Sequence, residues 1–112
     1  MNGESPNFTK ALSIEVPLDP IEAAQVVSGS PSAGAVGLGE FDSREYGVWE
    51  HTVGVSTDVE VDEIFVVLKG SAILSFEDGS SVELRAGSVG RLREGQRTTW
   101  DVREVLRKIY FS

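Results

Sequence analysis

The stretch Ala72-Ile-Leu-Ser-Phe76-Glu-Asp-Gly79-Ser-Ser-Val82-Glu-Leu84 decides the fold class. Each of its ends carries a short apolar or alternating run, as strands do, and Asp78-Gly79 stands between the two runs. Aspartate followed by glycine is a strong signal for a tight hairpin turn, because glycine adopts the positive φ that such a turn requires. The stretch therefore predicts two antiparallel strands joined by a short turn.

The rest of the chain from residue 35 repeats this pattern of short runs and turn signals. No amphipathic helix of three turns lies among them. Short strands at near-regular spacing predict an all-β sandwich or barrel, and we take residues 35–112 as one domain of this class. The predicted strands span residues 35–41, 45–53, 59–68, 72–76, 81–85, 89–92, 98–102 and 105–111.

Residues 1–34 read as an N-terminal arm. Its apolar stretch Ala11–Val16 is a candidate edge strand. Asp19-Pro20-Ile21-Glu22 has the layout of a helix start, with a cap, a proline at the first helical position and a capping-box glutamate. Ser28-Gly29-Ser30-Pro31 ends the following run after a few residues, so one or two helical turns and a plain loop both remain open.

The composition limits the class of protein. The chain has 112 residues and a formal net charge of −8, so we expect one domain and no nucleic-acid partner, since such binding depends on lysine and arginine. Without cysteine, disulfides and thiolate metal ligands are excluded. No apolar run is long enough to span a membrane, and residues 1–10 have neither a basic n-region nor an apolar h-region. We therefore expect a cytoplasmic protein with no membrane partner.

The charge is unevenly spread along the chain. Residues 40–63 hold eight acids and one base, a balance of −7, whereas residues 85–108 hold seven bases and three acids, a balance of +4. We expect these two stretches to face each other and to pair, or to open around a charged ligand. Within the first stretch Asp58, Glu60 and Asp62 alternate, which predicts a solvated acidic edge, with a cation site as the alternative.

Two segments of the predicted barrel carry a family resemblance. Glu63-Ile-Phe-Val-Val-Leu-Lys-Gly70 resembles the end of the first cupin motif, and Gly87-Ser-Val-Gly-Arg-Leu-Arg-Glu-Gly95-Gln-Arg-Thr98 resembles the second in the spacing of its glycines. Gly47-Val-Trp49-Glu and Thr99-Trp100 look like the branch that contains ureidoglycine aminohydrolase and the ethanolamine-utilisation cupin protein. The resemblance implies a single-domain cupin, a double-stranded β-helix or jelly-roll barrel.

Most of the family's metal-binding residues are absent from this chain. A typical cupin holds a divalent metal with three histidines and a glutamate, and only Glu63 matches. The chain has one histidine, His51, so a histidine-rich site is excluded by count. The family's histidine positions fall on Ser56 and Asp58, or on Thr57 and Val59 with the shorter spacing, and on Thr98.

The sequence therefore identifies no cofactor. An oxygen-rich site of Glu63, Asp58 and His51 would suit Mg²⁺, Ca²⁺ or Mn²⁺. The other interpretation is a degenerate site that holds no metal.

The motif position makes Glu63 the candidate for ligand contact or general acid/base catalysis, the alternative being a barrel-mouth glutamate satisfied by an arginine. Trp100 shares a strand face with Thr98, and aromatic walls with a few polar groups are typical of small-ligand pockets. Core packing or internal ion pairing is the other interpretation of each candidate. The candidate ligand-binding residues are Glu63, Thr98, Trp100, His51, Trp49 and Arg91.

These observations favour a small cupin that binds a small polar molecule in its barrel with a degenerate or absent metal site. One alternative is a metal-dependent enzyme resembling the family's aminohydrolases, acting on a small nitrogen-containing acid whose carboxylate an arginine holds. Another is a non-catalytic partner subunit with a filled barrel. Because Ile64–Leu68 is apolar on both faces, we also expect a cover for the outer face, which favours a homodimer.

Overall fold

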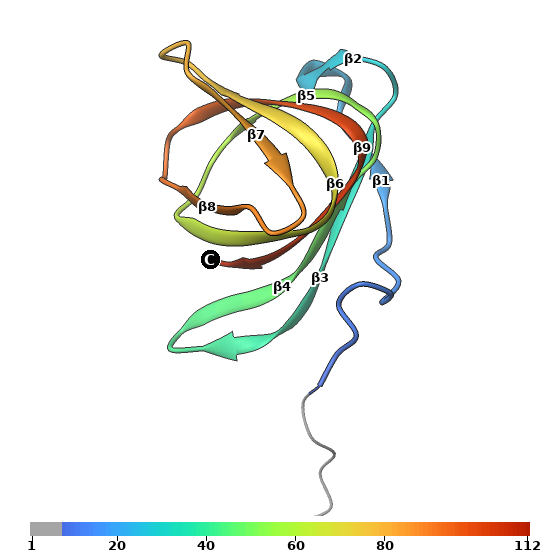
Figure 1. Ribbon diagram of the computed structural model, residues 1–112, viewed down its shortest axis with the longest axis vertical. Coiled ribbons are helices and arrows are strands. Elements are labelled where there is room, and N and C mark those ends of the chain that lie inside the picture. The colour runs from blue at the N-terminus through green and yellow to red at the C-terminus, as the bar shows by residue number, and fades with distance from the viewer. Residues whose placement is uncertain (1–7) are drawn as a thin grey trace, which may run out of the picture.

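The computed structural model describes residues 8–112, and almost all of the regular structure there is β. Figure 1 shows the strands curled around a central axis, with a long hairpin extending from the curl. The elements are β1 (Asp19–Pro20), the 3₁₀ turn η1 (Ala23–Gln25), β2 (Val26–Ser28), β3 (Ser32–Phe41), β4 (Arg44–His51), β5 (Gly54–Val59), β6 (Glu63–Phe76), β7 (Ser81–Arg85), β8 (Val89–Leu92) and β9 (Arg97–Phe111).

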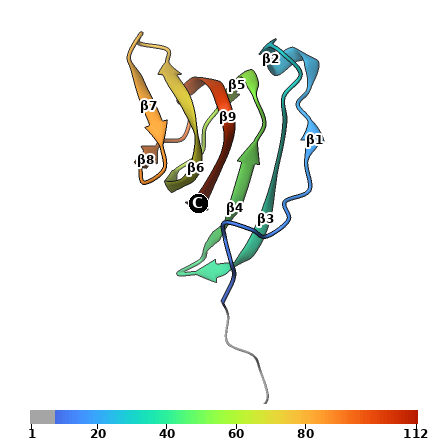
Figure 2. The same cartoon turned by 45° about the vertical axis from the view of Figure 1, so that its right-hand side comes forward.

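Two long, bent strands close the barrel. The first half of β9, residues 97–102, lies between β5 and the second half of β6. Its second half, residues 106–111, lies between β4 and the first half of β6. Since β6 and β9 belong to both layers, the sheet folds back on itself, with β7 and β8 completing it along β6 (Figures 1 and 2). The all-β jelly-roll barrel predicted from the sequence is confirmed.

The strand bounds differ from the prediction at the bends. Lys69-Gly70 separates two predicted strands, but β6 runs through it with shifts of register, and β9 likewise runs through residues 103–104. The polar strand β5 is not predicted, since residues 55–58 fall between the predicted strands at 45–53 and 59–68. Its serine and threonine side chains conceal the strand pattern, although it pairs with both β2 and β9.

The N-terminal region differs as well. Residues 11–16 form a turn and extended chain, and the added edge strands are the short β1 and β2. The helix start reduces to the single turn η1, whose N-cap Glu22 makes no side-chain capping bond. The arm is nevertheless attached to the barrel, because Arg107 Nη1 donates to the carbonyl oxygen of Ala11 at 3.0 Å and Val16 is buried. Residues 1–7 of the predicted arm lie outside the described residues.

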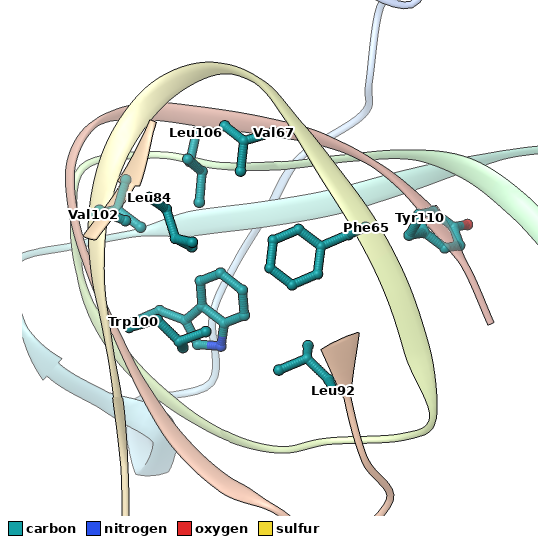
Figure 3. Packing of buried hydrophobic residues seen from close by; sticks show 10 residues of the cluster. Phe65, Val67, Leu84, Leu92, Trp100, Val102, Leu106 and Tyr110 are labelled. Carbon is teal, nitrogen blue, oxygen red and sulfur yellow. The ribbon is translucent and has the colours of Figure 1, made fainter. Parts of the chain in front are cut away.

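The core fills the interior between the two layers (Figure 3). The predicted face of Thr98, Trp100 and Val102 is confirmed, since all three are buried. On β6 the inward residues Phe65 and Val67 are buried as well, whereas the outward Ile64 is 49% exposed. The outer face of this strand is thus only partly covered within one chain.

No helix among residues 8–112 is long and apolar enough to cross a membrane.

Gly70 lies at the bend of β6, and we predict that it tolerates no side chain. Its φ is +93°, and a Cβ there would overlap the carbonyl of Val105 on β9. Gly79, with φ +90° and open space around it, is the matched control. We expect Gly79→Ala to lower the free energy of unfolding by about 1 kcal/mol through backbone strain. Gly70→Ala should lower it by about 3 kcal/mol, because overpacking adds to the strain. Equal losses in urea unfolding would contradict the role of this contact.

Candidate functional site

A cavity of about 490 Å³ occupies one end of the barrel. Its lining residues come from strands β3, β4, β5, β6 and β9 of the barrel and from β1 and η1 of the N-terminal region. Sequence reasoning selected four of its lining residues as binding candidates: Trp49, His51, Glu63 and Trp100. The cavity therefore brings together most of the predicted ligand-binding set.

Lys108, which lies on β9 opposite Trp49 of β4, places its ammonium inside the barrel. Its Nζ donates to Oε2 of Glu63 at 2.6 Å, and both side chains are nearly fully buried. A charge removed from water requires a partner, and each of these two groups is the other's. Glu63 is thus satisfied by an internal cation. The alternative interpretation from the sequence places an arginine in that role, whereas the cation is a lysine.

Three aromatic rings enclose the same ammonium. Lys108 Nζ lies 4.5 Å from the ring centroids of Trp49 and Phe65 and 4.8 Å from that of Trp100. The faces of aromatic rings are electron-rich and attract cations at such distances. In Figure 3, Phe65 and Trp100 point into the barrel from β6 and β9. The rings and Glu63 together hold one positive charge at a fixed point in the barrel.

Glu60 lies in the short loop between β5 and β6 and is buried, so the prediction of a solvated acidic edge is wrong for this residue. Its Oε2 accepts hydrogen bonds from Thr98 Oγ1 at 2.5 Å and from Trp100 Nε1 at 3.0 Å. Its other oxygen, Oε1, has no hydrogen-bond partner among residues 8–112, and Glu60 lines the cavity. Glu60 therefore fixes the indole of Trp100 through one carboxylate oxygen, and the other oxygen stays free of hydrogen bonds from residues 8–112.

His51, at the end of β4, is held at both ring nitrogens. Nδ1 lies 2.6 Å from the carbonyl oxygen of Thr52, and Nε2 lies 2.8 Å from Oγ of Ser56. Burial lowers the pKa of His51 below 6.5, and the positive charge of Lys108 lowers it further, against the opposing effect of the Thr52 carbonyl. At neutral pH the ring is therefore uncharged.

Asp58 stands at the rim of the cavity. Its Oδ1 accepts the backbone N–H of Val59 at 2.8 Å. Burial raises the pKa of Asp58, and the negative charge of Glu63 adds to this, while the Val59 N–H and Lys108 act in the opposite direction. On the far side Tyr110 donates to Glu45 at 2.8 Å, and burial together with this bond raises the pKa of Tyr110 to about 12.

Two predicted binding residues lie outside this cavity. Thr98 is behind the wall, bonded to Glu60. Arg91 is exposed on β8, within 3.5 Å of Asp62. The expected pairing between the acidic and basic stretches is confirmed by three ion pairs: Lys108–Glu63, Arg107–Glu50 and Arg91–Asp62.

The donor set does not suit the metal ion that the cupin resemblance implies. The oxygen of Glu63 that faces the barrel interior holds the Lys108 ammonium, and both nitrogens of His51 have partners. Among residues 8–112 no group of three or more histidine, cysteine, aspartate or glutamate side chains converges on one point. A divalent cation at the motif position would stand beside a fixed ammonium, which Coulomb repulsion opposes.

Sequence reasoning missed Lys108, Ser56 and the burial of Glu60. Lys108 alternates with the apolar Leu106 and Tyr110, and this period of two indicates an inward lysine on a strand. The adjacent Arg107 points the other way, to Glu50. For Ser56 the cupin resemblance marks the position, but no local pattern reveals its hydrogen bond to a histidine five residues away across a turn.

The fold and this site define a cupin that holds a lysine ammonium inside its barrel. A model of the EutQ-like cupin domain matches residues 38–110, more than half of the chain. The chain therefore belongs to the EutQ-like cupin domain family. No curated protein matches its sequence significantly.

Solved structures share the fold at low identity. The EutQ protein of Clostridium difficile has a TM-score of 0.70 and 18% identity, over 91% of this chain and 82% of that one. A putative ethanolamine utilization protein from Salmonella typhimurium has a TM-score of 0.60 and 16% identity, over 88% and 95%. A DUF861-family protein of unknown function from Pseudomonas syringae has a TM-score of 0.70 and 22% identity, over 88% of this chain and 44% of that one.

The Lys108–Glu63 pair gives a prediction on stability. Lys108→Met leaves a buried carboxylate unpaired, so we expect the free energy of unfolding to fall by about 4 kcal/mol. Adding Glu63→Gln to that variant removes the orphaned charge and should restore more than half of the loss. Urea unfolding of the two single variants and the double variant measures the coupling. Additive losses would contradict a direct pair inside the barrel.

The lowered pKa of His51 predicts a pH dependence of stability. Below pH 6.5 the unfolded chain takes up a proton that the folded protein resists, so unfolding becomes more favourable as the pH falls. We expect the melting temperature of the wild type to fall more steeply than that of His51→Gln between pH 7.5 and about 5.5. The raised pKa of Asp58 acts in the opposite direction but is common to both proteins. Parallel curves would show that His51 titrates normally.

Proposed function

We propose that this protein is a small-molecule-binding cupin in which the Lys108 ammonium takes the place of the family's metal ion. The observation that carries the proposal is the position of this ammonium, bonded to the motif glutamate Glu63 and enclosed by three aromatic rings. The cavity beside it has the size and mixed lining of a small-ligand site. Fixed polar groups in such a cavity select a ligand by hydrogen bonding.

The charges of the lining favour a class of ligand. Five carboxylates, of Asp19, Glu22, Asp58, Glu60 and Glu63, line the cavity with one lysine. An anion entering there would meet more repulsion than attraction. The free Oε1 of Glu60 and the rim carboxylate of Asp58 accept hydrogen bonds. The ligand we propose is therefore small, rich in donors, and neutral or positively charged, such as a polyol or a primary amine.

The alternative of a metal-dependent aminohydrolase acting on a small acid has less support. The arginine needed to hold the substrate carboxylate is absent from the described lining, since Arg91 lies on the outer side. A non-catalytic partner subunit would fit a filled barrel better than one with this cavity. The cytoplasmic location expected from the sequence stays a prediction.

Thermal-shift titration with matched compounds tests the proposal. We expect short polyols or primary amines to raise the melting temperature saturably, and carboxylates of equal carbon number to leave it unchanged. Asp58→Asn should weaken the effect of an amine about tenfold, as the loss of one partly exposed charge contact does. Glu94→Gln, an exposed carboxylate outside the cavity, is the control variant.

The metal content of protein purified without chelator decides between the two functions. A stoichiometric transition metal that is lost in Glu63→Ala would contradict the proposal and support the metal-dependent alternative.

We also propose that two copies associate through the outer face of β4, β9 and β6. Tyr46, Phe111 and Ile64 lie directly opposite one another across these three strands and form an apolar row. Such a row is complementary to itself under two-fold symmetry. We expect Ile64→Lys to give monomers in analytical ultracentrifugation, and Val82→Lys, at a similar exposure of 47% on β7, to leave the dimer intact. A monomeric wild type would contradict this.

A further inference from the structure

Ser56 and His51 form a hydrogen-bonded pair in the wall of the cavity. The Thr52 carbonyl can only accept, so Nδ1 of His51 carries the ring proton that fills the 2.6 Å contact. Nε2 of the neutral ring is then an acceptor, and the hydroxyl of Ser56 donates to it at 2.8 Å. The histidine is thus fixed in one tautomer, with its lone pair directed at a serine hydroxyl.

The backbone holds this pair in place. His51 ends β4, Ser56 lies inside β5, and a short turn through Gly54 connects them. Gly54 has a φ of +146°, and a Cβ there would collide with the ring of Pro31. Both side chains are almost fully buried, at 1% and 4% exposure, in the wall of the cavity. The pair therefore lies at the cavity wall and is shielded from bulk water.

We propose that Ser56 is a nucleophile for acyl transfer from small esters, with His51 as its general base and the Thr52 carbonyl as the group that orients the imidazole. A nucleophile within hydrogen-bond reach of a base, and a base oriented by a third group, is the arrangement by which serine hydroxyls are activated. The inference rests on the proposed function in one respect, namely that the cavity admits a small molecule.

The reaction requires only the ester and one molecule of water. Ser56 Oγ bonds to the ester carbonyl carbon as its proton passes to Nε2 of His51, and the carbonyl electron pair moves onto oxygen. The bond from that carbon to the alcohol oxygen then breaks, and the alcohol leaves with the proton from Nε2. Water repeats both steps on the acyl-serine, which releases the carboxylic acid and restores the hydroxyl of Ser56.

Lys108 is the one cationic side chain in the described lining, and we assign it the stabilisation of the developing oxyanion. An ammonium has three donors, and one of them is used by Glu63. Its charge already acts on His51, since it lowers the pKa of that ring. The carboxylates around the cavity oppose negatively charged substrates. The substrate class is therefore a short, uncharged or cationic ester.

Labelling with phenylmethanesulfonyl fluoride tests the nucleophile. This reagent forms a sulfonate ester with an activated serine hydroxyl and releases fluoride. We expect one label per chain, on Ser56 in peptide mapping, and none in Ser56→Ala. His51→Gln should slow labelling about 100-fold, as loss of a general base does. Ser71→Ala is the matched control, because Ser71 is also buried and hydrogen-bonded but lies outside the cavity, and its labelling should equal that of the wild type.

Hydrolysis of p-nitrophenyl acetate gives a second readout, in which we expect a burst of nitrophenolate that Ser56→Ala abolishes. Absence of label, label on another serine, or a labelling rate that His51→Gln leaves unchanged would overturn the inference. If a polyol or amine still raises the melting temperature in that case, the proposed binding function stands and the nucleophile alone fails.

Discussion

The ion pair between Lys108 and Glu63, enclosed by Trp49, Phe65 and Trp100, is the constraint on which the interior depends. It connects the start of β6 to the end of β9, the two strands that belong to both layers of the barrel. A buried pair of this kind contributes little net stability compared with a well-packed apolar core, but each partner alone would be costly. The pair holds one positive charge at a fixed point beside the cavity.

Glu63 stands at the start of β6, at the position where the cupin resemblance places a metal-ligand glutamate. In this chain that glutamate serves a lysine and not a ring of histidine ligands. The remaining polar groups of the cavity are then free for other chemistry. Glu60 positions the indole of Trp100, and Ser56 and His51 form a pair that faces the same space. In our proposals, this one barrel interior provides a fixed cation, acceptors for a ligand and a nucleophilic serine.

The sequence predicts the barrel because its signals are local, as at Asp78-Gly79, where turn chemistry and alternation agree. The predicted strand ends are wrong where a strand bends without ending, as at Gly70, because glycine in a sequence is also the usual sign of a turn. The site was only half predictable. Trp100 follows from its motif and its strand face, whereas the sequence analysis assigns no role to Lys108, because charged residues on strands usually lie on the surface. Glu60 is buried by contacts from a strand 38 positions further along the chain, which no local pattern reveals.

An NMR spectrum of protein labelled with ¹³C at the ε-carbon of lysine tests most directly whether the Lys108 ammonium lies inside the barrel. The chain has three lysines, Lys10, Lys69 and Lys108, and the first two are exposed. Ring currents from three aromatic faces should shift the ε-methylene protons of Lys108 well upfield, while the other two signals stay at the values of free lysine. Loss of the upfield signal in Lys108→Arg assigns it. Three signals at the free-lysine position would contradict an ammonium inside the barrel.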